Sequence, residues 1–473
     1  MKNKHFLILA IALFGLLAMS FNKSKVTKPN IVLIYIDDMG YGDIARYGAQ
    51  GYTTPNFDQM AAEGISFTQF YSPQAVCTAS RAGLLTGCYP NRLGFSGAID
   101  HTSKIGINSD EETIAELLKD QGYATAAYGK WHLGHLPKFL PTNHGFDEFF
   151  GIPYSHDMWP NHPVNKNYYP ALPLIQNLET IETNPDNTQF TTWFTEKTVD
   201  FITRKKDQPF FVYLAHPMPH VPLGVSSKFK GKSKQGLYGD VIMEIDWSLG
   251  QVRETLKKLK LDENTLVIVT SDNGPWFNYG NHAGSTGGLR EGKGSTYDGG
   301  QKVPCLMSWK GKIPSGLVSS SLSSAIDILP TIVDATGAKM PKRRIDGLSL
   351  MEVLNGKTDA KPRETFLYYY RRNNLEAVRH GDWKLVFPHP GRTYEGFSPG
   401  KDGMPGGANE NHSFAGGLYD LRRDPGERYN LMFDYPEITK QLNEIADNAR
   451  EDLGDALTQK EGKNRREIGR IDN

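Results

Sequence analysis

Three runs of consecutive apolar residues, each ending in polar residues, constrain the fold of this chain most strongly. They are "NIVLIYI" at 30–36, "PFFVYLA" at 209–215 and "TLVIVTS" at 265–271. Each run has the length of a strand and is apolar at nearly every position, which is typical of parallel strands buried on both faces. We therefore expect these runs to lie in the centre of a covered β-sheet.

Helical patterns alternate with these runs. Residues 112–121 ("ETIAELLKDQ") predict a helix and residues 123–128 the strand after it. A helix around 190–204 precedes the second run, and a long helix at about 238–259 precedes the third. In the long helix, apolar residues recur every three or four positions. Alternating helices and strands predict an α/β fold, with a large, mostly parallel sheet sandwiched between helices.

The pattern changes after about residue 345. Short β-prone runs separated by turn signals, such as "LEAVRHGDWKLVF", predict antiparallel strands, and "PEITKQLNEIADNARE" predicts a closing helix. We interpret the glycine-rich run from 391 to 417 as a loop. A chain of 473 residues is long for one domain. We expect a large domain over 25–345 and a smaller C-terminal α+β subdomain with an antiparallel sheet over 346–473.

The first 24 residues have the pattern of a secretory signal peptide. Lys2 and Lys4 precede an apolar run from Phe6 to Met19, which is short for a membrane span. The alternative is an uncleaved N-terminal anchor. We expect cleavage after residues 1–24, export of the mature protein to a periplasm, and no membrane attachment afterwards.

Charge and cysteine content exclude several classes of protein. The 53 basic residues equal the 53 acidic residues in number, so nucleic acid and anionic membrane surfaces are not indicated as partners. Any anion recognition must be local. Cys77, Cys88 and Cys305 are the only cysteines, and three cysteines do not resemble a disulfide framework.

Oxygen-bearing side chains follow two of the apolar runs. Asp37 and Asp38 follow the first run, and Asp272 and Asn273 follow the third. In open α/β sheets, ligands bind beyond the carboxyl ends of the strands, and four such side chains suit Ca²⁺ or Mg²⁺. Each pair alone is also typical of an ordinary turn or helix cap.

Three further segments carry groups suited to an anion. "GKWHLG" places Lys130 and His132 after a predicted strand, "HPMPH" presents His220 after another, and the glycine-rich "LREGKGSTYDGG" contains Lys293. Each segment alone has a structural explanation, because a solvent-facing lysine or a flexible loop would look the same.

The segment "VCTASRAGLLTGCYPNR" places Cys77 just before a predicted helix and Arg81 four residues later. Free N–H groups and the helix dipole favour negative charge at such a position. One interpretation is a free thiol with a lowered pKa that serves redox chemistry. The other depends on a family resemblance.

Taken together, these segments resemble the type I sulfatase family, the formylglycine-dependent sulfatases of the alkaline phosphatase superfamily. "CTASR" fits the family's Cys-x-Pro/Ala-x-Arg signature, and "LLTGCYPNR" fits its continuation. "GKWHLG" followed by "HGFDEFFGIPYSHD" is similar to the branch that contains arylsulfatase A and N-acetylgalactosamine-6-sulfatase. The resemblance extends from about residue 29 into "LYDLRRDPGERYNL" and implies an alkaline phosphatase-like fold and hydrolysis of a sulfate ester.

The resemblance also implies a mechanism. Cys77 would be oxidised to formylglycine (3-oxoalanine), whose hydrated aldehyde attacks sulfur with one hydroxyl and later expels sulfate with the other. One Ca²⁺ per chain would bind sulfate oxygen. The same resemblance implies that Ca²⁺ is bound by Asp37, Asp38, Asp272 and Asn273. It implies that Arg81 holds the formylglycine hydroxyl and that Lys130 and Lys293 bind sulfate oxygens. It also implies that His132 accepts a proton during sulfate release and that His220 protonates the leaving alcohol oxygen or at least binds near it.

One departure from the family pattern concerns maturation. Ala79 stands where most members carry proline. The aerobic maturation enzyme prefers proline, whereas the radical-SAM type also accepts alanine. The resemblance therefore implies a formylglycine-generating maturase of the radical-SAM type as a partner.

The resemblance to carbohydrate-acting members favours an O-sulfate on a sugar of a host glycan or an algal polysaccharide. Candidate pocket residues lie in loops, where ordinary packing explains them equally well: His101, Tyr154, His156, Asp157 and Trp159. Two alternatives remain open. One is a phosphonate monoester or phosphodiester hydrolase of the same superfamily. The other is a non-catalytic sulfated-glycan binding protein with unmodified Cys77, although a binder would not need His132.

Overall fold

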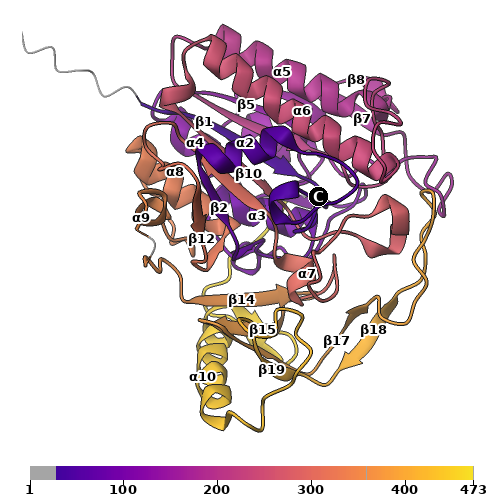
Figure 1. Ribbon diagram of the computed structural model, residues 1–473, viewed down its shortest axis with the longest axis vertical. Coiled ribbons are helices and arrows are strands. Elements are labelled where there is room, and N and C mark those ends of the chain that lie inside the picture. Colours follow the sequence, from indigo (N-terminus) through magenta and orange to yellow (C-terminus); the bar gives the residue numbers. More distant parts are fainter. Residues whose placement is uncertain (1–27, 358, 472–473) are drawn as a thin grey trace, which may run out of the picture.

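A ten-stranded mixed sheet forms the centre of the computed structural model, which describes residues 28–357 and 359–471 (Figure 1). The predicted signal peptide lies outside the described residues. The strand order is β12-β2-β11-β10-β1-β9-β5-β6-β7-β8. In chain order the strands are β1 (Asn30–Ile36), β2 (Ile65–Phe67), β5 (Ala124–Lys130), β6 (Glu148–Ile152), β7 (Pro173–Gln176), β8 (Glu179–Thr183), β9 (Phe210–His216), β10 (Thr265–Ser271), β11 (Cys305–Ser308) and β12 (Leu317–Ser319).

The middle of this sheet is parallel, as the apolar runs predict. β1 pairs in parallel with β10 and β9, and β9 with β5. Antiparallel pairs are confined to the flanks, for example β10 with β11 and β7 with β8. The predicted α/β fold with a mixed, mostly parallel sheet is therefore confirmed.

Helices cover both faces of the sheet. Alternate residues of β1 enter two different cores: Ile31, Leu33 and Tyr35 pack on one face, and the residues between them pack on the other. On the first face lie α3 (Cys77–Thr86), α4 (Ile114–Lys119) and α8 (Ile328–Thr336), and on the second lie α2 (Pro55–Glu63), α5 (Phe190–Arg204) and α6 (Leu237–Lys258).

The predicted helices agree closely with the observed ones. The pattern over 190–204 coincides with α5, and that over 238–259 is shifted by one residue from α6. The pattern over 112–121 overestimates α4. That helix begins after Thr113, whose hydroxyl accepts from the backbone N–H of Glu116 while the Glu116 carboxylate accepts from that of Thr113.

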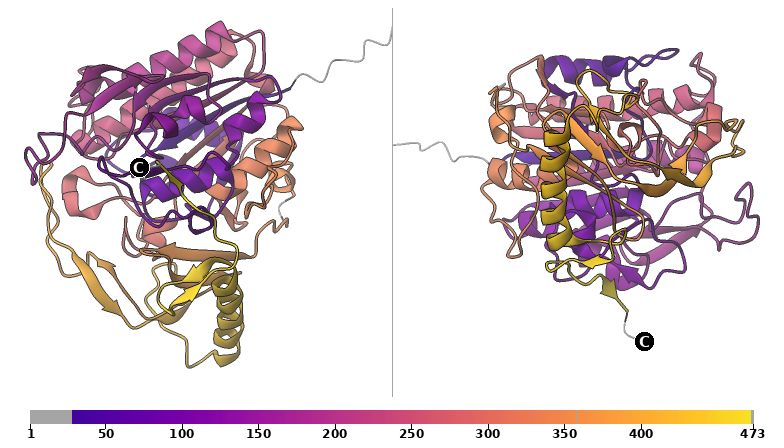
Figure 2. Two further views of the ribbon diagram at one scale, coloured as in Figure 1. Left: turned by 180° about the vertical axis from the view of Figure 1, so that it is seen from behind. Right: turned by 90° about the horizontal axis from the view of Figure 1, so that it is seen from below.

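A separate four-stranded antiparallel sheet lies in the C-terminal part, as predicted, with α10 (Pro436–Leu453) packed against it (Figures 1 and 2). Its order is β14-β15-β16-β19. These strands are β14 (Thr365–Tyr370), β15 (Asn374–His380), β16 (Trp383–Val386) and β19 (Gly417–Asp420). The C-terminal strand β22 (Gly469–Arg470) then returns to the large sheet's side of the molecule and pairs with β4 (Ile105–Gly106).

The prediction that residues 391–417 form only a loop is wrong. β17 (His389–Thr393) and β18 (Asn409–Phe414) pair as an antiparallel ribbon at the two ends of this run. The register shifts between Gly391 and Thr393, and five glycines lie between the strands. Glycine content obscured the ribbon because strand propensity is low at such positions. Across the described ranges, no helix combines the length and the apolar character needed to cross a bilayer.

Candidate active site

The parallel pairing of β1 with β10 brings four predicted metal ligands together. Ile36 is in register with Ser271, so the next two residues of each strand leave the sheet side by side. All four side chains, Asp37, Asp38, Asp272 and Asn273, are buried. The backbone N–H of Asp38 donates to Asp272 Oδ1 at 3.0 Å, which connects the two strand ends.

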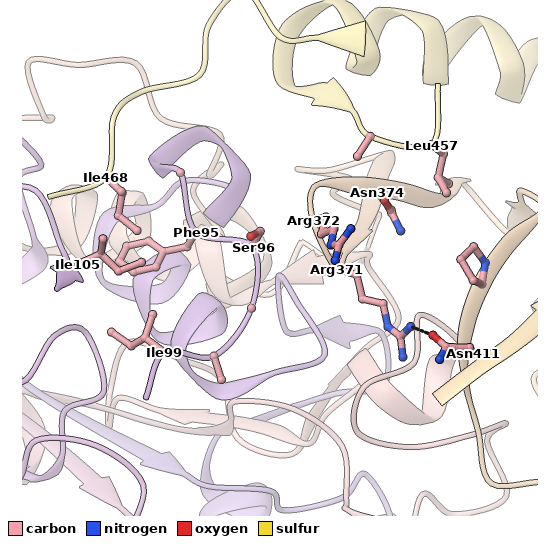
Figure 3. A pocket seen from close by; sticks show the side chains of 15 residues that line it. Phe95, Ser96, Ile99, Ile105, Arg371, Arg372, Asn374, Asn411, Leu457 and Ile468 are labelled. Carbon is pink, nitrogen blue, oxygen red and sulfur yellow. Dashed lines mark hydrogen bonds between the residues drawn. The ribbon is translucent and has the colours of Figure 1, made fainter. Parts of the chain in front are cut away.

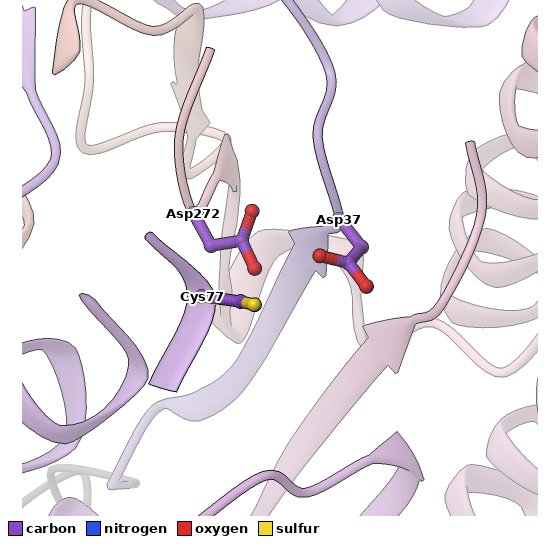
Figure 4. Close-up of side chains that lie close together, drawn as sticks. All are labelled: Asp37, Cys77 and Asp272. Atoms are coloured by element: carbon purple, nitrogen blue, oxygen red, sulfur yellow. The ribbon is translucent and has the colours of Figure 1, made fainter. Parts of the chain in front are cut away.

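Cys77 is the first residue of α3 and points at this cluster (Figure 4). Its Sγ and one carboxylate oxygen each from Asp37 and Asp272 lie within 4.8 Å of one another. These three residues could hold a metal ion. Cys77 is 3 % exposed, and burial raises the pKa of its thiol. The positive charges of Lys130 and Lys293 act to lower this pKa, but burial has the larger effect. The thiol is therefore neutral at ordinary pH.

Buried cations neutralise two of the carboxylates. Arg81, one turn along α3 from Cys77, donates to Asp272 Oδ2 from Nη2 at 2.7 Å and from Nε at 3.1 Å. Lys130, the last residue of β5, donates to Asp37 Oδ2 at 2.5 Å. Burial acts to raise the pKa of Asp37, but neighbouring positive charges, led by Lys130, hold it well below its usual range.

Asp38 has a separate set of partners. Lys293 Nζ lies 2.7 Å from its Oδ1, and Asn273 Nδ2 donates to the same oxygen at 2.6 Å. His220 Nε2 lies 3.6 Å from Asp38 Oδ2. The site therefore contains three carboxylates and three basic side chains, which balance in formal charge.

His132 presents one specific nitrogen to the site. Its Nε2 lies 2.8 Å from the carbonyl oxygen of Ile99, and a carbonyl only accepts, so Nε2 carries the proton. Nδ1 is buried, has no hydrogen-bond partner among the described residues, and holds a lone pair. Burial, with the charge of Lys130, lowers the pKa of His132 well below its usual range, so the ring is neutral. A neutral imidazole with a free lone pair can accept a proton.

The structure brings only some of the predicted pocket residues to this centre. The ring of His156 lies 5.7 Å from that of His220. The pKa of Asp157 is lowered: burial acts to raise it, but neighbouring positive charge, led by His220, outweighs burial. Tyr154 packs instead against His135. His101 contacts Tyr168 and Tyr169, and Trp159 is partly buried against the second core.

Sequence reasoning missed three residues at the site. Trp276 lies under Lys293, with Nζ 4.6 Å from the ring centroid, and its ring is 5.5 Å from that of His220. Its place directly after "SDNGP" was an available signal. Arg392 and Tyr394 both donate to the Lys293 carbonyl oxygen, at 3.3 and 2.6 Å. Nothing in their local sequence indicates this contact.

A helix-covered sheet with a buried cysteine, carboxylates and basic side chains at its strand ends is suited to the hydrolysis of anionic esters. Comparison with known proteins identifies the particular group. The family model "Sulfatase" matches residues 29–338, and "C-terminal region of aryl-sulfatase" matches 361–468.

Individual relatives agree with the family models. N-acetylgalactosamine-6-sulfatase of Canis lupus familiaris is 39% identical over 88% of this chain and 84% of its own length. Human arylsulfatase A is 37% identical over 91% of this chain and 89% of its own. Among solved structures, a Bacteroides thetaiotaomicron sulfatase from work on the metabolism of multiple glycosaminoglycans has a TM-score of 0.78 and 29% identity, over 90% of this chain and 99% of its own.

The chain belongs to the type I sulfatase family, in the branch of arylsulfatase A and N-acetylgalactosamine-6-sulfatase. It is a sulfuric ester hydrolase of the alkaline phosphatase superfamily.

Proposed function

We propose that this sulfatase removes an O-sulfate from a sugar of a sulfated glycan or polysaccharide, with formylglycine at position 77 as the nucleophile. The names of its relatives support a sulfated sugar as the substrate. The observation that carries the mechanism is the position of Cys77, buried at the start of α3 between Asp37 and Asp272.

The chemistry of the site favours an oxygen nucleophile over a thiol at position 77. A neutral buried thiol is a poor nucleophile, and a thiol beside two carboxylates is a soft ligand in a hard, oxygen-rich site. Oxidation of Cys77 to a hydrated aldehyde would place hydroxyl oxygens where the sulfur now lies. Those oxygens suit the neighbouring carboxylates, the cations and the substrate.

The four residues at the strand ends fit Ca²⁺. All offer oxygen ligands, and Asp37 Oδ1 and Asn273 Oδ1 are buried without a hydrogen-bond partner among the described residues. We infer that Asp37, Asp38, Asp272 and Asn273 hold the ion. When bound, Ca²⁺ would polarise a sulfate oxygen and lower the pKa of a neighbouring hydroxyl.

The basic side chains would bind the charges that develop during the reaction. Lys130 and Lys293 lie on opposite sides of the carboxylate cluster, one on Asp37 and one on Asp38, and would turn toward sulfate oxygens. Arg81 lies one helical turn from position 77, and Asp272 fixes its guanidinium. Arg81 would therefore hold the hydroxyl at position 77. These donors are already buried at the site before the substrate enters.

The two histidines have complementary roles. His132 Nδ1 would accept the proton of the second hydroxyl at position 77 as sulfate is released. His220 Nδ1 donates to the Val221 carbonyl oxygen at 2.6 Å, which leaves Nε2 to carry a proton to the leaving alcohol oxygen. We assign the wall on the leaving-group side to His156 and Asp157, which adjoin His220. His101, Tyr154 and Trp159 remain candidates for the outer pocket.

Maturation and location follow from the same proposal. Ala79 favours a radical-SAM maturase, and the N-terminal pattern favours export to the periplasm after removal of residues 1–24. We propose a catalytic domain over 25–345 and a C-terminal subdomain over 346–473.

The test is peptide mass spectrometry across residue 77 on protein made with a radical-SAM maturase. A formylglycine mass together with sulfate release from an aryl sulfate is the expected result. Matched aryl phosphate and phosphonate esters serve as controls for the superfamily alternative. Unmodified Cys77 in protein that still releases sulfate at full rate would overturn the proposed nucleophile.

A further inference from the structure

A cavity of about 930 Å³ lies between the two parts of the molecule (Figure 3). One wall is the 94–99 loop with Ile105, and the opposite wall is the turn between β14 and β15, which carries Arg371 and Arg372. Leu457 and Ile468, from the C-terminal segment, also line it. None of the predicted catalytic, metal-binding or pocket residues lines this cavity, although Ile99, the hydrogen-bond partner of His132, does.

The charge of the lining has one sign. Arg371 and Arg372 contribute two positive charges, and no acidic residue of the described chain lines the cavity. Arg371 Nη1 donates to Asn411 Oδ1 at 3.2 Å, and its Nη2 bonds to the Glu410 carbonyl oxygen and lies 3.4 Å from Glu410 Oε2, so the charge of Arg371 is partly balanced. Within the described ranges, no hydrogen bond or ion pair engages the exposed Arg372 side chain. Arg372 is therefore available to a ligand.

The turn that carries these arginines is strained and firmly held. Arg371, Arg372 and Asn373 have φ of 39°, 24° and 71°, in the left-handed region that residues other than glycine rarely occupy. The Asn373 side chain accepts from Asn91 Nδ2 at 2.6 Å and donates to the Leu453 carbonyl oxygen at 2.9 Å. Such strain persists only where the surroundings impose it, and here it fixes the two arginines at the cavity.

Both walls are joined to the reacting centre by hydrogen bonds. Ile99, on the loop wall, accepts from His132 and donates from its backbone N–H to Thr78 Oγ1 at 3.2 Å, beside Cys77. On the other wall, Pro390 lies in β17, and Arg392 of the same strand donates to the Lys293 carbonyl oxygen. The cavity thus adjoins the site on the side of His132 and Lys293.

We propose that this cavity is a subsite for an anionic group, sulfate or carboxylate, on the sugar next to the one that carries the scissile sulfate. The proposal rests on the proposed function, because it requires a glycan substrate. Arg372 would bind the anion through the planar fork of its guanidinium. The partly exposed apolar side chains of Ile105 and Leu457, on the two sides of the cavity, would contact the sugar ring. The substrate class is then a polyanionic glycan rather than a singly sulfated one.

The kinetic test compares Arg372→Gln with the control Arg423→Gln, which removes an arginine that is 76% exposed on the same subdomain. Mature enzyme is assayed on 4-nitrocatechol sulfate and on two tetrasaccharides. In the chondroitin 6-sulfate tetrasaccharide, the sugar next to the sulfated one carries a carboxylate. In the ι-carrageenan tetrasaccharide, that neighbouring sugar carries a sulfate. We expect Arg372→Gln to reduce kcat/KM about tenfold or more on a tetrasaccharide, through KM. For the aryl sulfate, kcat/KM of Arg372→Gln should change less than twofold. The control Arg423→Gln should leave kcat/KM unchanged on the aryl sulfate and on the tetrasaccharides.

A binding measurement separates this proposal from the proposed function. In a Cys77→Ala background, which cannot turn over, calorimetry gives Kd for the same tetrasaccharides and for N-acetylgalactosamine 6-sulfate. Arg372-dependent preference for a tetrasaccharide over the monosaccharide supports the subsite even if mature enzyme releases no sulfate, in which case only the proposed function fails. Equal Kd for tetrasaccharide and monosaccharide, or an Arg372→Gln effect that is equal on aryl and sugar substrates, would overturn the subsite while leaving the sulfatase activity intact.

Discussion

The two histidines of the site differ in which nitrogen is free. His132 donates from Nε2 to the Ile99 carbonyl oxygen, which leaves Nδ1 with its lone pair, whereas His220 donates from Nδ1 to the Val221 carbonyl oxygen, which leaves Nε2. A backbone carbonyl therefore fixes each tautomer. This division suits one residue to accept a proton and the other to deliver one.

Removal of His220 should affect substrates according to their leaving group. In His220→Ala, we expect kcat for sugar sulfates to fall about 10²- to 10⁴-fold, because an alkoxide leaves poorly without a proton. For 4-nitrophenyl sulfate, whose phenolate leaves unassisted, we expect a loss below about tenfold. Steady-state kinetics on both substrates make the comparison. Equal losses would remove His220 from the acid role and leave it a binding residue.

At the scale of single residues, the sequence predicts groups that follow strands and misses groups that approach from elsewhere. Asp37 and Asp272 were predictable because polar residues directly follow apolar runs, and parallel strands end at one edge of a sheet. Arg392 was not predictable, since about a hundred residues separate it from Lys293. A contact between residues far apart in the chain cannot be predicted from the local sequence pattern of either residue.

At the scale of elements, strand β5 approaches its neighbour β9 very closely at Gly129. The residue lies directly before Lys130, has φ of 110°, and stands in register with Gly151 of β6. A Cβ at this position would meet the Ala215 carbonyl oxygen of β9 at 1.9 Å. Backbone atoms of a central strand cannot withdraw, so the approach of β9 to β5 requires glycine here.

Gly129→Ala should therefore destabilise the protein far more than a substitution at a glycine with open space around it. We expect a loss of about 3 kcal/mol or more, from left-handed strain plus overlap. Gly122→Ala is the matched control: φ is 80°, but the space around it is open, so strain alone should cost about 1 kcal/mol. Urea unfolding measures both. Similar losses for the two variants would contradict the close packing of β5 on β9.

Element type was more predictable than element extent. α5 and α6 were found because their apolar stripes are long and bury one face. The ribbon of β17 and β18 was missed because its glycines and polar residues do not alternate with apolar residues as in a typical strand. Backbone pairing of the two strands, rather than their composition, stabilises it. That ribbon carries Arg392, so the same omission hid a contact to the site.

At the scale of the whole molecule, a buried ion cluster joins the C-terminal sheet to the segment that carries Lys293. Lys384 of β16 is fully buried and lies 3.0 Å from Asp298 Oδ1 and 2.7 Å from Glu427 Oε1. It also donates to the Thr296 carbonyl oxygen at 2.8 Å. Asp298 and Thr296 adjoin the Lys293 loop, so this contact fixes the C-terminal sheet against the segment that supplies a site lysine.

Lys384→Met should leave two buried carboxylates without their cation. We expect a loss of about 3–5 kcal/mol at pH 8, the cost of breaking a buried pair. Lys440→Met, an exposed lysine on α10, is the control and should be neutral. Denaturant unfolding at both pH 5 and pH 8 makes the measurement.

The pH dependence of this loss has a definite sign. Burial already raises the pKa of Glu427, with Lys384 opposing, so removal of Lys384 should raise the folded-state pKa further. A carboxyl whose folded pKa lies above its unfolded value stabilises the fold below the unfolded pKa, and this contribution is lost as pH rises through the folded pKa. The deficit of Lys384→Met should therefore be smaller at pH 5 than at pH 8. A deficit that is independent of pH would show that Lys384 acts by packing alone.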